Sequence, residues 1–332
     1  MKKVVVTGGA GFIGSHAVDL LLEKGYEVHV IDNLSGGRLS NLQHNLNNSN
    51  LIFHQIDILS YGDLEPIFID VDFVLHFAGI GDIVPSINSP LSYIQVNVQG
   101  TANVLEASRV NKVRKFVYAA SSSCYGLAET PTTEDHPIQP MYPYALSKHM
   151  GELCVLHWNS VYKISVNSLR IFNAYGPRSR TSGAYGAVFG VFLAQKLAGF
   201  PLTMVGDGQQ SRDFIYVSDV ARAFVLAGEA ILTQHIIMNV GTGQSQTILN
   251  LTSLIGGRVV HIPDRPGEPK QTLAENSRIK NELGWRQEVD FTTGVTKVLQ
   301  NIELWSGAPV WDEKSIETET KNWFRFLDNG SK

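Results

Sequence analysis

The sequence has few cysteines, no cluster of positive charge and no long apolar run, and each shortage excludes a class of protein. Cys124 and Cys154 are the only cysteines among 332 residues, too few for a disulfide scaffold and consistent with a reducing cytoplasm. The formal net charge is −4 and lysine and arginine form no run, which argues against nucleic acid as the main partner. No apolar segment is long enough to cross a bilayer, and the one that follows Lys2 and Lys3 is too short for a signal peptide. We expect a cytoplasmic protein without a membrane span or a bound metal.

A glycine-rich turn near the start is the strongest positive signal in the sequence. Residues 4–6 are all valine, a β-branched run typical of a strand that is buried on both faces. Gly8, Gly11 and Gly14 follow at once, and an apolar helical pattern begins among them. A strand, a tight turn and a helix N-terminus form a phosphate site, because bare backbone N–H groups and the positive end of the helix face an anion. The spacing is G-x-x-G-x-x-G rather than the dinucleotide pattern G-x-G-x-x-G, so the turn needs support from its context.

Asp32 supplies that context. It follows a second predicted strand, about 20 residues beyond the turn, where an acidic side chain accepts hydrogen bonds from a ribose diol and repels a 2′-phosphate. We therefore predict NAD rather than NADP; the alternative is a structural turn with an incidental aspartate. Asp57 and Ile58, after a predicted strand at 51–56, are expected to cover the adenine. Small residues after a strand at 73–77 would let the cofactor approach closely.

Strands and helices alternate through the first half of the chain. The predicted strands are residues 4–6, 27–31, 51–56, 73–77 and 115–119. With helical patterns such as 90–110 between them, they indicate an α/β fold with a Rossmann-type doubly wound parallel sheet, whose ligands lie at the carboxyl ends of the strands. We expect an NAD-binding domain at residues 1–170 and a smaller C-terminal α/β domain at 171–332 that mainly binds the substrate, with a strand near 236–240 returning to the first sheet. His76, inside its strand, is more consistent with packing than with catalysis.

Tyr144 is the one tyrosine of eleven with a lysine four residues on, Lys148, one helical turn away on the same face. A free tyrosine titrates near pH 10, but an ammonium and a nicotinamide cation nearby would both favour the phenolate. Serines 121–123 come directly after a predicted strand and fall at the same edge of the sheet. The combination predicts a catalytic site; the alternative is a chance spacing on a surface helix. The predicted cofactor-binding residues are Gly8, Gly11, Phe12, Ile13, Gly14, Asp32, Asn33, Asp57, Ile58, Phe77, Ala78, Gly79, Asn97, Tyr144 and Lys148.

From residue 1 to about residue 300 the chain resembles the extended short-chain dehydrogenases/reductases that act on nucleotide sugars, and among them the UDP-glucose 4-epimerase group. The resemblance is carried by TGGAGFIGS at 7–15, DNL at 32–34, DI at 57–58, SSS with YG at 121–126, Y-x-x-x-K at 144–148, RIFNAYGPR at 170–178, GDG-x-x-SRDFIYV-x-DV at 206–220, RPGEP at 265–269 and ELGW at 282–285.

This resemblance implies roles for individual residues. Tyr144 would take a proton from a sugar hydroxyl, Lys148 would lower the tyrosine pKa and bind the nicotinamide ribose, and Ser121 would orient the reacting oxygen. The arginines that fall on family motifs suit a diphosphate because planar guanidinium groups match phosphate oxygens. The implied substrate-binding residues are Ser122, Ser123, Asn173, Arg212, Arg265, Glu268 and Thr272.

The resemblance also favours epimerisation at C4 of the sugar, with NAD bound and a transient 4-keto intermediate. Dehydratases of the family need an Asp-Glu pair and decarboxylases a glutamate where this chain has Ser122 and Ser123. A large aromatic residue at the position of Thr272 would exclude an N-acetyl group from C2 of the sugar, so we expect room for a UDP-N-acetylhexosamine as well as a UDP-hexose. Gly81, where many UDP-glucose epimerases have a lysine, points the same way.

Two other functions stay open. A 4-ketoreductase of the same family would use the same residues and release its cofactor in each turnover, although Asp32 argues against NADPH. A non-catalytic sensor of NAD or of a sugar nucleotide would have less reason to keep Tyr144 and Lys148. The resemblance further implies a homodimer that pairs through the helices near 90–110 and 144–161.

The last segment lies beyond the resemblance. Residues 312–327 form an amphipathic helical pattern with Ile316, Trp323, Phe324 and Leu327 on or near one face. This stripe predicts packing against the core, and a subunit contact is the alternative.

Overall fold

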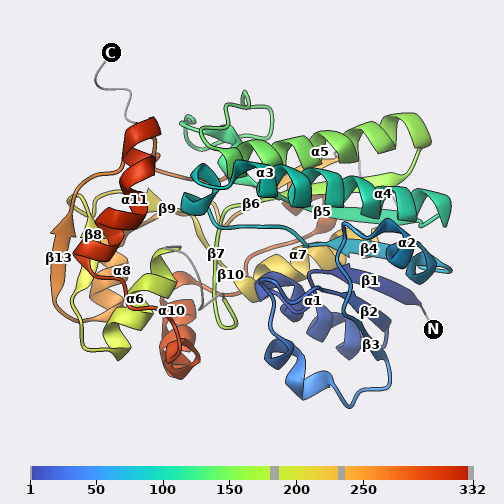
Figure 1. Ribbon diagram of the computed structural model, residues 1–332, viewed down its shortest axis with the longest axis horizontal. Coiled ribbons are helices and arrows are strands. Elements are labelled where there is room, and N and C mark those ends of the chain that lie inside the picture. Colours follow the sequence, from blue (N-terminus) through green and yellow to red (C-terminus); the bar gives the residue numbers. More distant parts are fainter. Residues whose placement is uncertain (1, 180–186, 231–235, 328–332) are drawn as a thin grey trace.

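A seven-stranded parallel sheet forms the larger part of the computed structural model, which describes residues 2–179, 187–230 and 236–327 (Figure 1). In spatial order its strands are β11 (Ile237–Val240), β6 (Ser165–Ile171), β5 (Lys115–Ser121), β4 (Phe73–His76), β1 (Lys3–Thr7), β2 (Glu27–Ile31) and β3 (Leu51–His54). The predicted Rossmann-type α/β fold is confirmed. The third strand is shorter than expected, because the backbone N–H of Ile56 turns back to the carbonyl oxygen of His54 and leaves the sheet.

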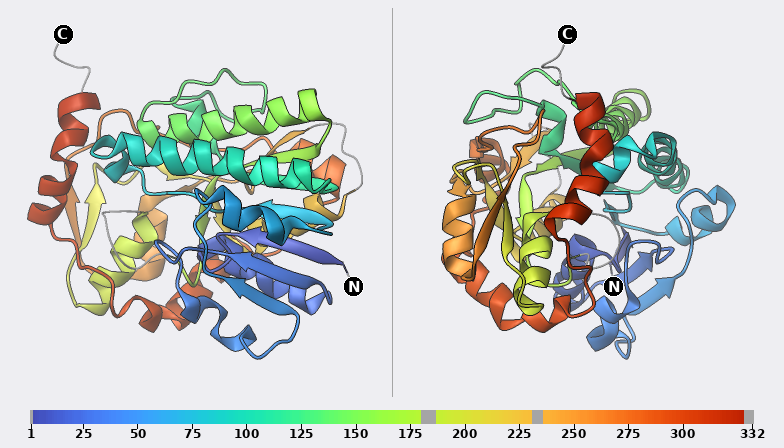
Figure 2. Two further views of the ribbon diagram at one scale, coloured as in Figure 1. Left: turned by 45° about the vertical axis from the view of Figure 1, so that its right-hand side comes forward. Right: turned by 60° about the vertical axis from the view of Figure 1, so that its left-hand side comes forward.

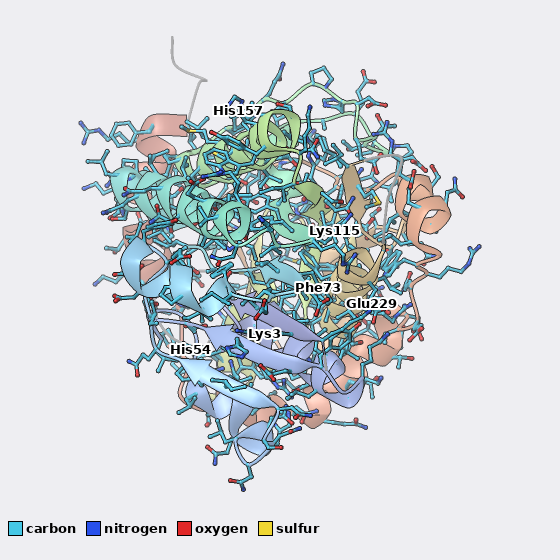
Figure 3. All side chains as sticks on the ribbon, turned by 90° about the vertical axis from the view of Figure 1, so that its right-hand side faces the viewer. Lys3, His54, Phe73, Lys115, His157 and Glu229 are labelled. Atoms are coloured by element: carbon cyan, nitrogen blue, oxygen red, sulfur yellow. The ribbon has the colours of Figure 1, made fainter. Side chains whose placement is uncertain are left out.

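Helices cover both faces of this sheet, because successive side chains of each strand point to opposite sides. Val4 and Val6 pack in a core with α1 (Phe12–Glu23) and α7 (Val217–Glu229). Val5 packs on the other side with α4 (Thr101–Val110) and α5 (Pro143–Tyr162), and the short α2 (Tyr61–Leu64) adds to that core. Figure 3 views the sheet from the amino ends of its strands, where Lys3, Phe73 and Lys115 start three neighbouring strands.

The predicted helix at 90–110 is interrupted. The structure has α3 (Pro90–Ile94), then a π-helical turn at Gln95–Gly100, then α4. The wider turn points the amide of Asn97 at the loop after β4, where it accepts from the backbone N–H of Ile80 at 2.8 Å and donates to Ser147 Oγ at 2.9 Å. The apolar spacing is the same for a regular helix, so the sequence pattern did not reveal the interruption.

A second, smaller α/β unit is built from the C-terminal half. Its short strands form three two-stranded pairs: β7 (Asn173–Tyr175) with β10 (Phe214–Tyr216), β8 (Leu202–Val205) with β13 (Val259–Ile262), and β9 (Ser211–Arg212) with β12 (Gln246–Thr247). Its helices are α6 (Val188–Leu197), α8 (Ile248–Ile255), α9 (Ser277–Leu283), α10 (Phe291–Gln300) and α11 (Glu313–Leu327). Most of them pack on a core rich in aromatic rings, with Tyr175, Phe189 and Phe214 at its centre. Within the described residues no helix is long and apolar enough to span a membrane.

Candidate active site

The glycine turn at the end of β1 is closed by its own backbone. The N–H of Gly8 donates to the carbonyl of Ile31, and the N–H of Gly11 donates to the carbonyl of Gly8, at 2.8 and 3.0 Å. Gly8 has φ +69°, and a Cβ there would lie 2.6 Å from the backbone nitrogen of Ala78; a Cβ on Gly14 would lie 2.2 Å from the carbonyl oxygen of Gly8. The turn therefore requires glycine, and it leaves backbone bare at the start of α1, which fits a phosphate group. Phe12 and Ile13 open that helix and pack towards the core of the smaller unit.

Asp32 lies beside this turn, at the carboxyl end of β2. Its carboxylate accepts hydrogen bonds from the backbone N–H groups of Ala10 (3.0 Å) and Leu34 (2.9 Å). Burial raises its pKa and these two bonds oppose that rise. The amide of Asn33 donates to Asp57 Oδ2 at 2.8 Å, so the polar residues predicted for the adenosine end lie together.

Ile58 and Phe77, which are predicted to bind the cofactor, pack against neighbouring side chains. The Ile58 side chain is buried, and a Cβ on Gly100 would lie 2.4 Å from its Cδ1. Phe77 packs its ring 4.4 Å from that of Phe224 on α7. Ile58 belongs to the core on one face of the sheet, and Phe77 packs against the core on the other face.

The loop after β4 runs between Asn97 and Lys148. A Cβ on Gly79 would lie 2.8 Å from Asn97 Oδ1 and 3.8 Å from Lys148 Nζ. Asn97 is fully buried and its amide is used in holding Ile80 and Ser147, so it fixes the loop from behind. Ala78 continues the same loop, and its N–H points at Thr7 Oγ1 at 3.3 Å.

His76 is a packed strand histidine, as expected. Its ring nitrogens lie 2.6 Å from Thr7 Oγ1 and 3.0 Å from Thr101 Oγ1, and the side chain is fully buried. Burial lowers its pKa to about 3. The ring is therefore neutral at physiological pH and occupied by two hydroxyls, so it is unsuited to move a proton to a ligand.

Tyr144 and Lys148 lie on the first two turns of α5, beside Ser121 at the end of β5. Burial raises the pKa of Tyr144, and a side-chain hydrogen bond with Ser121 opposes the rise. Burial lowers the pKa of Lys148 to about 7, and the charge of Glu152 opposes that fall. The Lys148 ammonium sits 4.4 Å from the centre of the Tyr118 ring. The pKa of Tyr144 is therefore raised in this structure, whereas the sequence led us to expect that nearby positive charges would favour the phenolate. Loss of water around the buried phenolate raises the pKa more than Ser121 lowers it.

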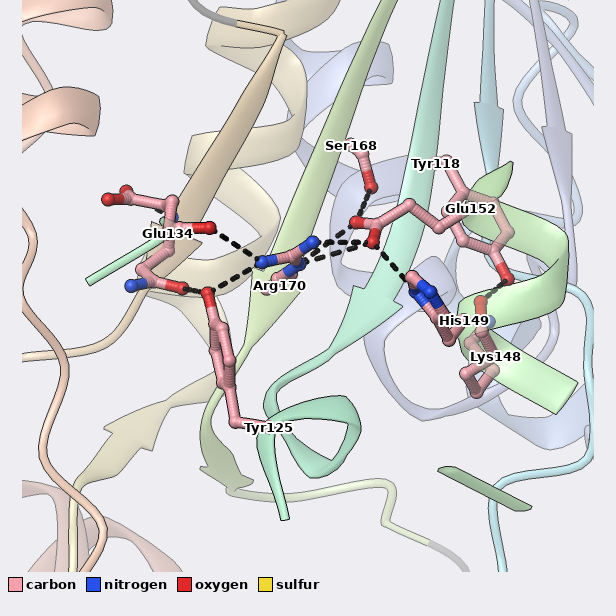
Figure 4. A network of polar contacts seen from close by, with 9 residues as sticks. Tyr118, Tyr125, Glu134, Lys148, His149, Glu152, Ser168 and Arg170 are labelled. Atoms are coloured by element: carbon pink, nitrogen blue, oxygen red, sulfur yellow. Dashed lines mark hydrogen bonds and ion pairs between the residues drawn. The ribbon is translucent and has the colours of Figure 1, made fainter. Parts of the chain in front are cut away.

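A buried ion pair that sequence reasoning missed lies directly behind these residues (Figure 4). The Glu152 carboxylate, one turn beyond Lys148, accepts from Arg170 Nη2 at 2.7 Å and from Ser168 Oγ at 2.7 Å. Burial raises the Glu152 pKa, but hydrogen bonds from His149, Arg170 and Ser168 outweigh it and bring it to about 2. The only available signal was a glutamate spaced four residues after Lys148.

Arg170 also joins this ion pair to the serine loop. It donates from Nη1 to the hydroxyl of Tyr125 at 2.9 Å and to the carbonyl oxygen of Glu134 at 3.1 Å (Figure 4). Tyr125 follows serines 121–123, and Glu152 is on the helix that carries Tyr144. The network therefore ties the two elements of the catalytic site to strand β6.

A cavity of about 340 Å³ lies between the two units. Its lining includes all seven residues predicted to bind the substrate: Ser122, Ser123, Asn173, Arg212, Arg265, Glu268 and Thr272. The Glu268 carboxylate bridges the two arginines, at 2.9 Å from Arg265 and 3.5 Å from Arg212. The hydroxyl of Thr272 donates to Asn173 Oδ1 at 2.9 Å, so these two side chains are fixed to each other.

Comparison with known proteins identifies the family of this chain. A sequence model of the NAD dependent epimerase/dehydratase family matches residues 4–241. A putative UDP-glucose 4-epimerase of Methanocaldococcus jannaschii is 36% identical over 89% of this chain and 97% of its own length. The structure of a UDP-N-acetylglucosamine 4-epimerase from Methanobrevibacter ruminantium, in complex with UDP-N-acetylmuramic acid, superposes with a TM-score of 0.84 at 34% identity, over 90% of this chain and 99% of that one. A UDP-glucuronic acid 4-epimerase from Bacillus cereus, with UDP-glucuronic acid and NAD, gives a TM-score of 0.84 at 32% identity, over 91% and 99%.

Proposed function

The chain belongs to the NAD-dependent epimerase/dehydratase family and is an NAD-dependent epimerase, and from this premise we propose that it inverts C4 of a UDP-hexose or UDP-N-acetylhexosamine through a transient 4-keto sugar. One observation carries the proposal. Ser121 stands near enough to Tyr144 to oppose the rise in its pKa, Lys148 follows one turn on, and the three residues adjoin a cavity lined by every residue predicted for the nucleotide sugar.

The residues around the glycine turn fit NAD. Gly8 and Gly14 leave no room for a Cβ, so backbone N–H groups rather than side chains face the ligand at the start of α1. Asp32, which lies beside the turn, would accept hydrogen bonds from a ribose diol, and Asn33 and Asp57 would lie towards the adenine. When bound there, NAD would supply the chemistry of accepting a hydride from C4 and returning it to the opposite face.

Side chains of the protein would accept and return the proton of the sugar C4 hydroxyl. The Tyr144 phenol oxygen would hold the proton of the C4 hydroxyl while the sugar is in its keto form and return it afterwards. Ser121 would orient the same sugar oxygen through its hydroxyl. The ammonium of Lys148 would favour the phenolate by its charge, and its depressed pKa makes that charge dependent on pH.

The diphosphate would lie against Arg212 and Arg265. Both guanidinium groups line the cavity and are held by one carboxylate, that of Glu268. One carboxylate neutralises only one of the two guanidinium charges, so the site keeps a net positive charge that a diphosphate would complement. Asn173, fixed by Thr272, would add an amide donor beside them.

Thr272 provides a test of sugar choice. Thr272→Tyr is expected to lower kcat/KM for UDP-GlcNAc by at least about tenfold while UDP-glucose loses much less, because the added ring occupies cavity space that the N-acetyl group needs. Thr272→Val is the matched control, since it removes the hydrogen bond to Asn173 without adding bulk. Equal losses for both sugars in the tyrosine variant would contradict the assignment.

Gly14 provides a test of the cofactor site. Gly14→Ala is expected to reduce the NAD that copurifies with the protein by about tenfold or more, because its Cβ would meet the carbonyl oxygen of Gly8 at 2.2 Å and displace the turn. NAD is quantified after denaturation of the purified protein. Gly62→Ala, where a Cβ meets nothing within 4 Å, is the control and should keep its NAD. Full retention of NAD by Gly14→Ala would place the cofactor elsewhere.

We also propose that the enzyme is a cytoplasmic homodimer. Leu91, Leu146, Leu153 and Val161 expose apolar side chains on α3 and α5, the helices through which a dimer is expected. Cys124 and Cys154 are both free thiols. Light scattering should give the mass of two chains, and Leu153→Lys should shift it towards one.

The experiment that tests the function uses the protein as isolated. It is incubated with UDP-glucose, UDP-galactose, UDP-GlcNAc and UDP-GalNAc without added nucleotide, and the NAD content is measured in parallel. Interconversion of one pair by protein with stoichiometric NAD would support the proposal and identify the sugar. Turnover that requires added NADH or NADPH would instead indicate the ketoreductase.

A further inference from the structure

The C-terminal helix α11 reaches the substrate cavity from outside the part of the chain that the sequence resemblance covers. The resemblance ends near residue 300, and the relatives are matched over 97% and 99% of their lengths while about a tenth of this chain stays unmatched. In Figures 1 and 2, α11 lies at the end of the molecule that the smaller unit forms. Ile316 and Trp323 are buried, as predicted for a core-packing stripe, and Trp323 also lines the cavity.

Trp323 contacts the aromatic residue next to the catalytic tyrosine. Its ring centre lies 5.3 Å from that of Tyr142, and the Tyr142 ring is stacked parallel to that of Tyr144 at 6.5 Å. Ser123 stands near enough to the Tyr142 hydroxyl to oppose the rise in the Tyr142 pKa that burial causes. Three rings in a row therefore connect the C-terminal helix to the catalytic base, and the middle ring lines the cavity together with Ser123.

Trp323 also fixes the loop that carries the diphosphate residues. Its indole Nε1 donates to the carbonyl oxygen of Pro266 at 2.8 Å, between Arg265 and Glu268. One residue earlier, Asn322 donates to Asn88 Oδ1 at 2.8 Å and anchors α11 to the segment after β4. One helix thus holds together three segments that line the cavity.

We propose that α11 is part of the substrate site and that Trp323 is a substrate-positioning residue. Its ring keeps Tyr142 against Tyr144, and its N–H keeps the Arg265–Glu268 loop at the cavity, so the sugar and the diphosphate are held in register with the catalytic base. The inference rests on the proposed function for the identity of the substrate. NAD would be bound by other elements, around β1 and β2, so its retention does not depend on Trp323.

The test compares Trp323→Ala, Trp323→Phe and Phe326→Ala. Trp323→Ala is expected to raise KM for the preferred UDP-sugar by about tenfold or more, with a smaller fall in kcat and unchanged NAD content. Trp323→Phe keeps a ring against Tyr142 but loses the bond to Pro266, so its KM should lie between those of the wild type and the alanine variant. Phe326 is on the same helix and 59% exposed, so Phe326→Ala should match the wild type.

An unchanged KM in folded, NAD-loaded Trp323→Ala overturns the proposal, as does an equal effect of Phe326→Ala. If Trp323→Ala does not fold, Trp323→Phe decides, and a wild-type KM in that variant overturns it. If the wild type converts no UDP-sugar, the proposed function fails, and this inference is then tested by calorimetric binding of UDP. Binding weakened by Trp323→Phe and retained by Phe326→Ala would support the inference, and equal binding by all three proteins would overturn it.

Discussion

Replacement of Tyr144 by phenylalanine is expected to lower kcat for epimerisation by a factor on the order of 10³ while the fold and the NAD content stay the same. The change removes one oxygen atom, the one that pairs with Ser121, and keeps the ring stacked on Tyr142 and packed against Tyr93. The sugar hydroxyl would thereby lose the proton acceptor that we propose for it. Initial rates and released NAD are measured on the same preparation.

A control for this variant is available on the same helix. Tyr162 ends α5 and is 46% exposed, with the Arg109 guanidinium 5.1 Å from its ring centre. Tyr162→Phe should keep full activity. Tyr144→Phe with more than about a tenth of the wild-type rate would show that another group moves the proton.

Breaking the Glu152–Arg170 pair is expected to have the largest effect on stability. Both side chains are almost fully buried, and their N–O distance is 2.7 Å. Arg170→Met leaves the Glu152 carboxylate without its main partner, which costs about 3–5 kcal/mol of unfolding free energy for a buried pair. Urea denaturation monitored by circular dichroism measures the loss.

The matched control is an exposed ion pair in the same layer. Arg109 and Glu106 are three residues apart on α4, 2.6 Å from each other and about a third exposed. Arg109→Met should cost far less unfolding free energy than Arg170→Met, because solvent screens the exposed pair. A cost for Arg170→Met as small as that of the control would show that the buried pair is not needed for the fold.

The pH dependence of this effect follows from the Glu152 pKa, which is lowered from 4.5 to about 2 in the folded protein. A depressed carboxyl pKa contributes stability above the unfolded value, and the contribution is lost as pH falls towards 2. The difference in unfolding free energy between wild type and Glu152→Gln should therefore be constant above about pH 5 and shrink below it.

Local patterns in the sequence were enough for the glycine turn, the parallel sheet and the Tyr144–Lys148 pair. The glycine turn and the Tyr144–Lys148 pair depend on residues that are close together in the chain. The parallel sheet follows from the alternation of apolar strand segments with helical segments along the chain. The resemblance then supplied residues such as Arg212 and Arg265, which are far apart in sequence and still line one cavity.

Features that depend on tertiary packing could not be predicted in the same way. The stripe on 312–327 indicated core packing, but it could not show that this part of the core adjoins the substrate cavity, where Trp323 meets Tyr142 and Pro266. The direction of the Tyr144 pKa depends on how much water the fold removes, and spacing alone carries no such information. The sequence did not show which residue pairs with Glu152, because Arg170 lies 18 residues away in the chain and only the position of β6 brings it into contact.

The central claim is that C4 of the sugar is oxidised and reduced again inside one closed site. It is tested most directly with a UDP-sugar that carries deuterium at C4, incubated with the protein as isolated in ordinary water and without added nucleotide. The account predicts that the 4-epimer retains the deuterium at C4, as measured by mass spectrometry and NMR, because that hydrogen leaves and returns without meeting solvent. Replacement of the deuterium by solvent hydrogen would contradict the account.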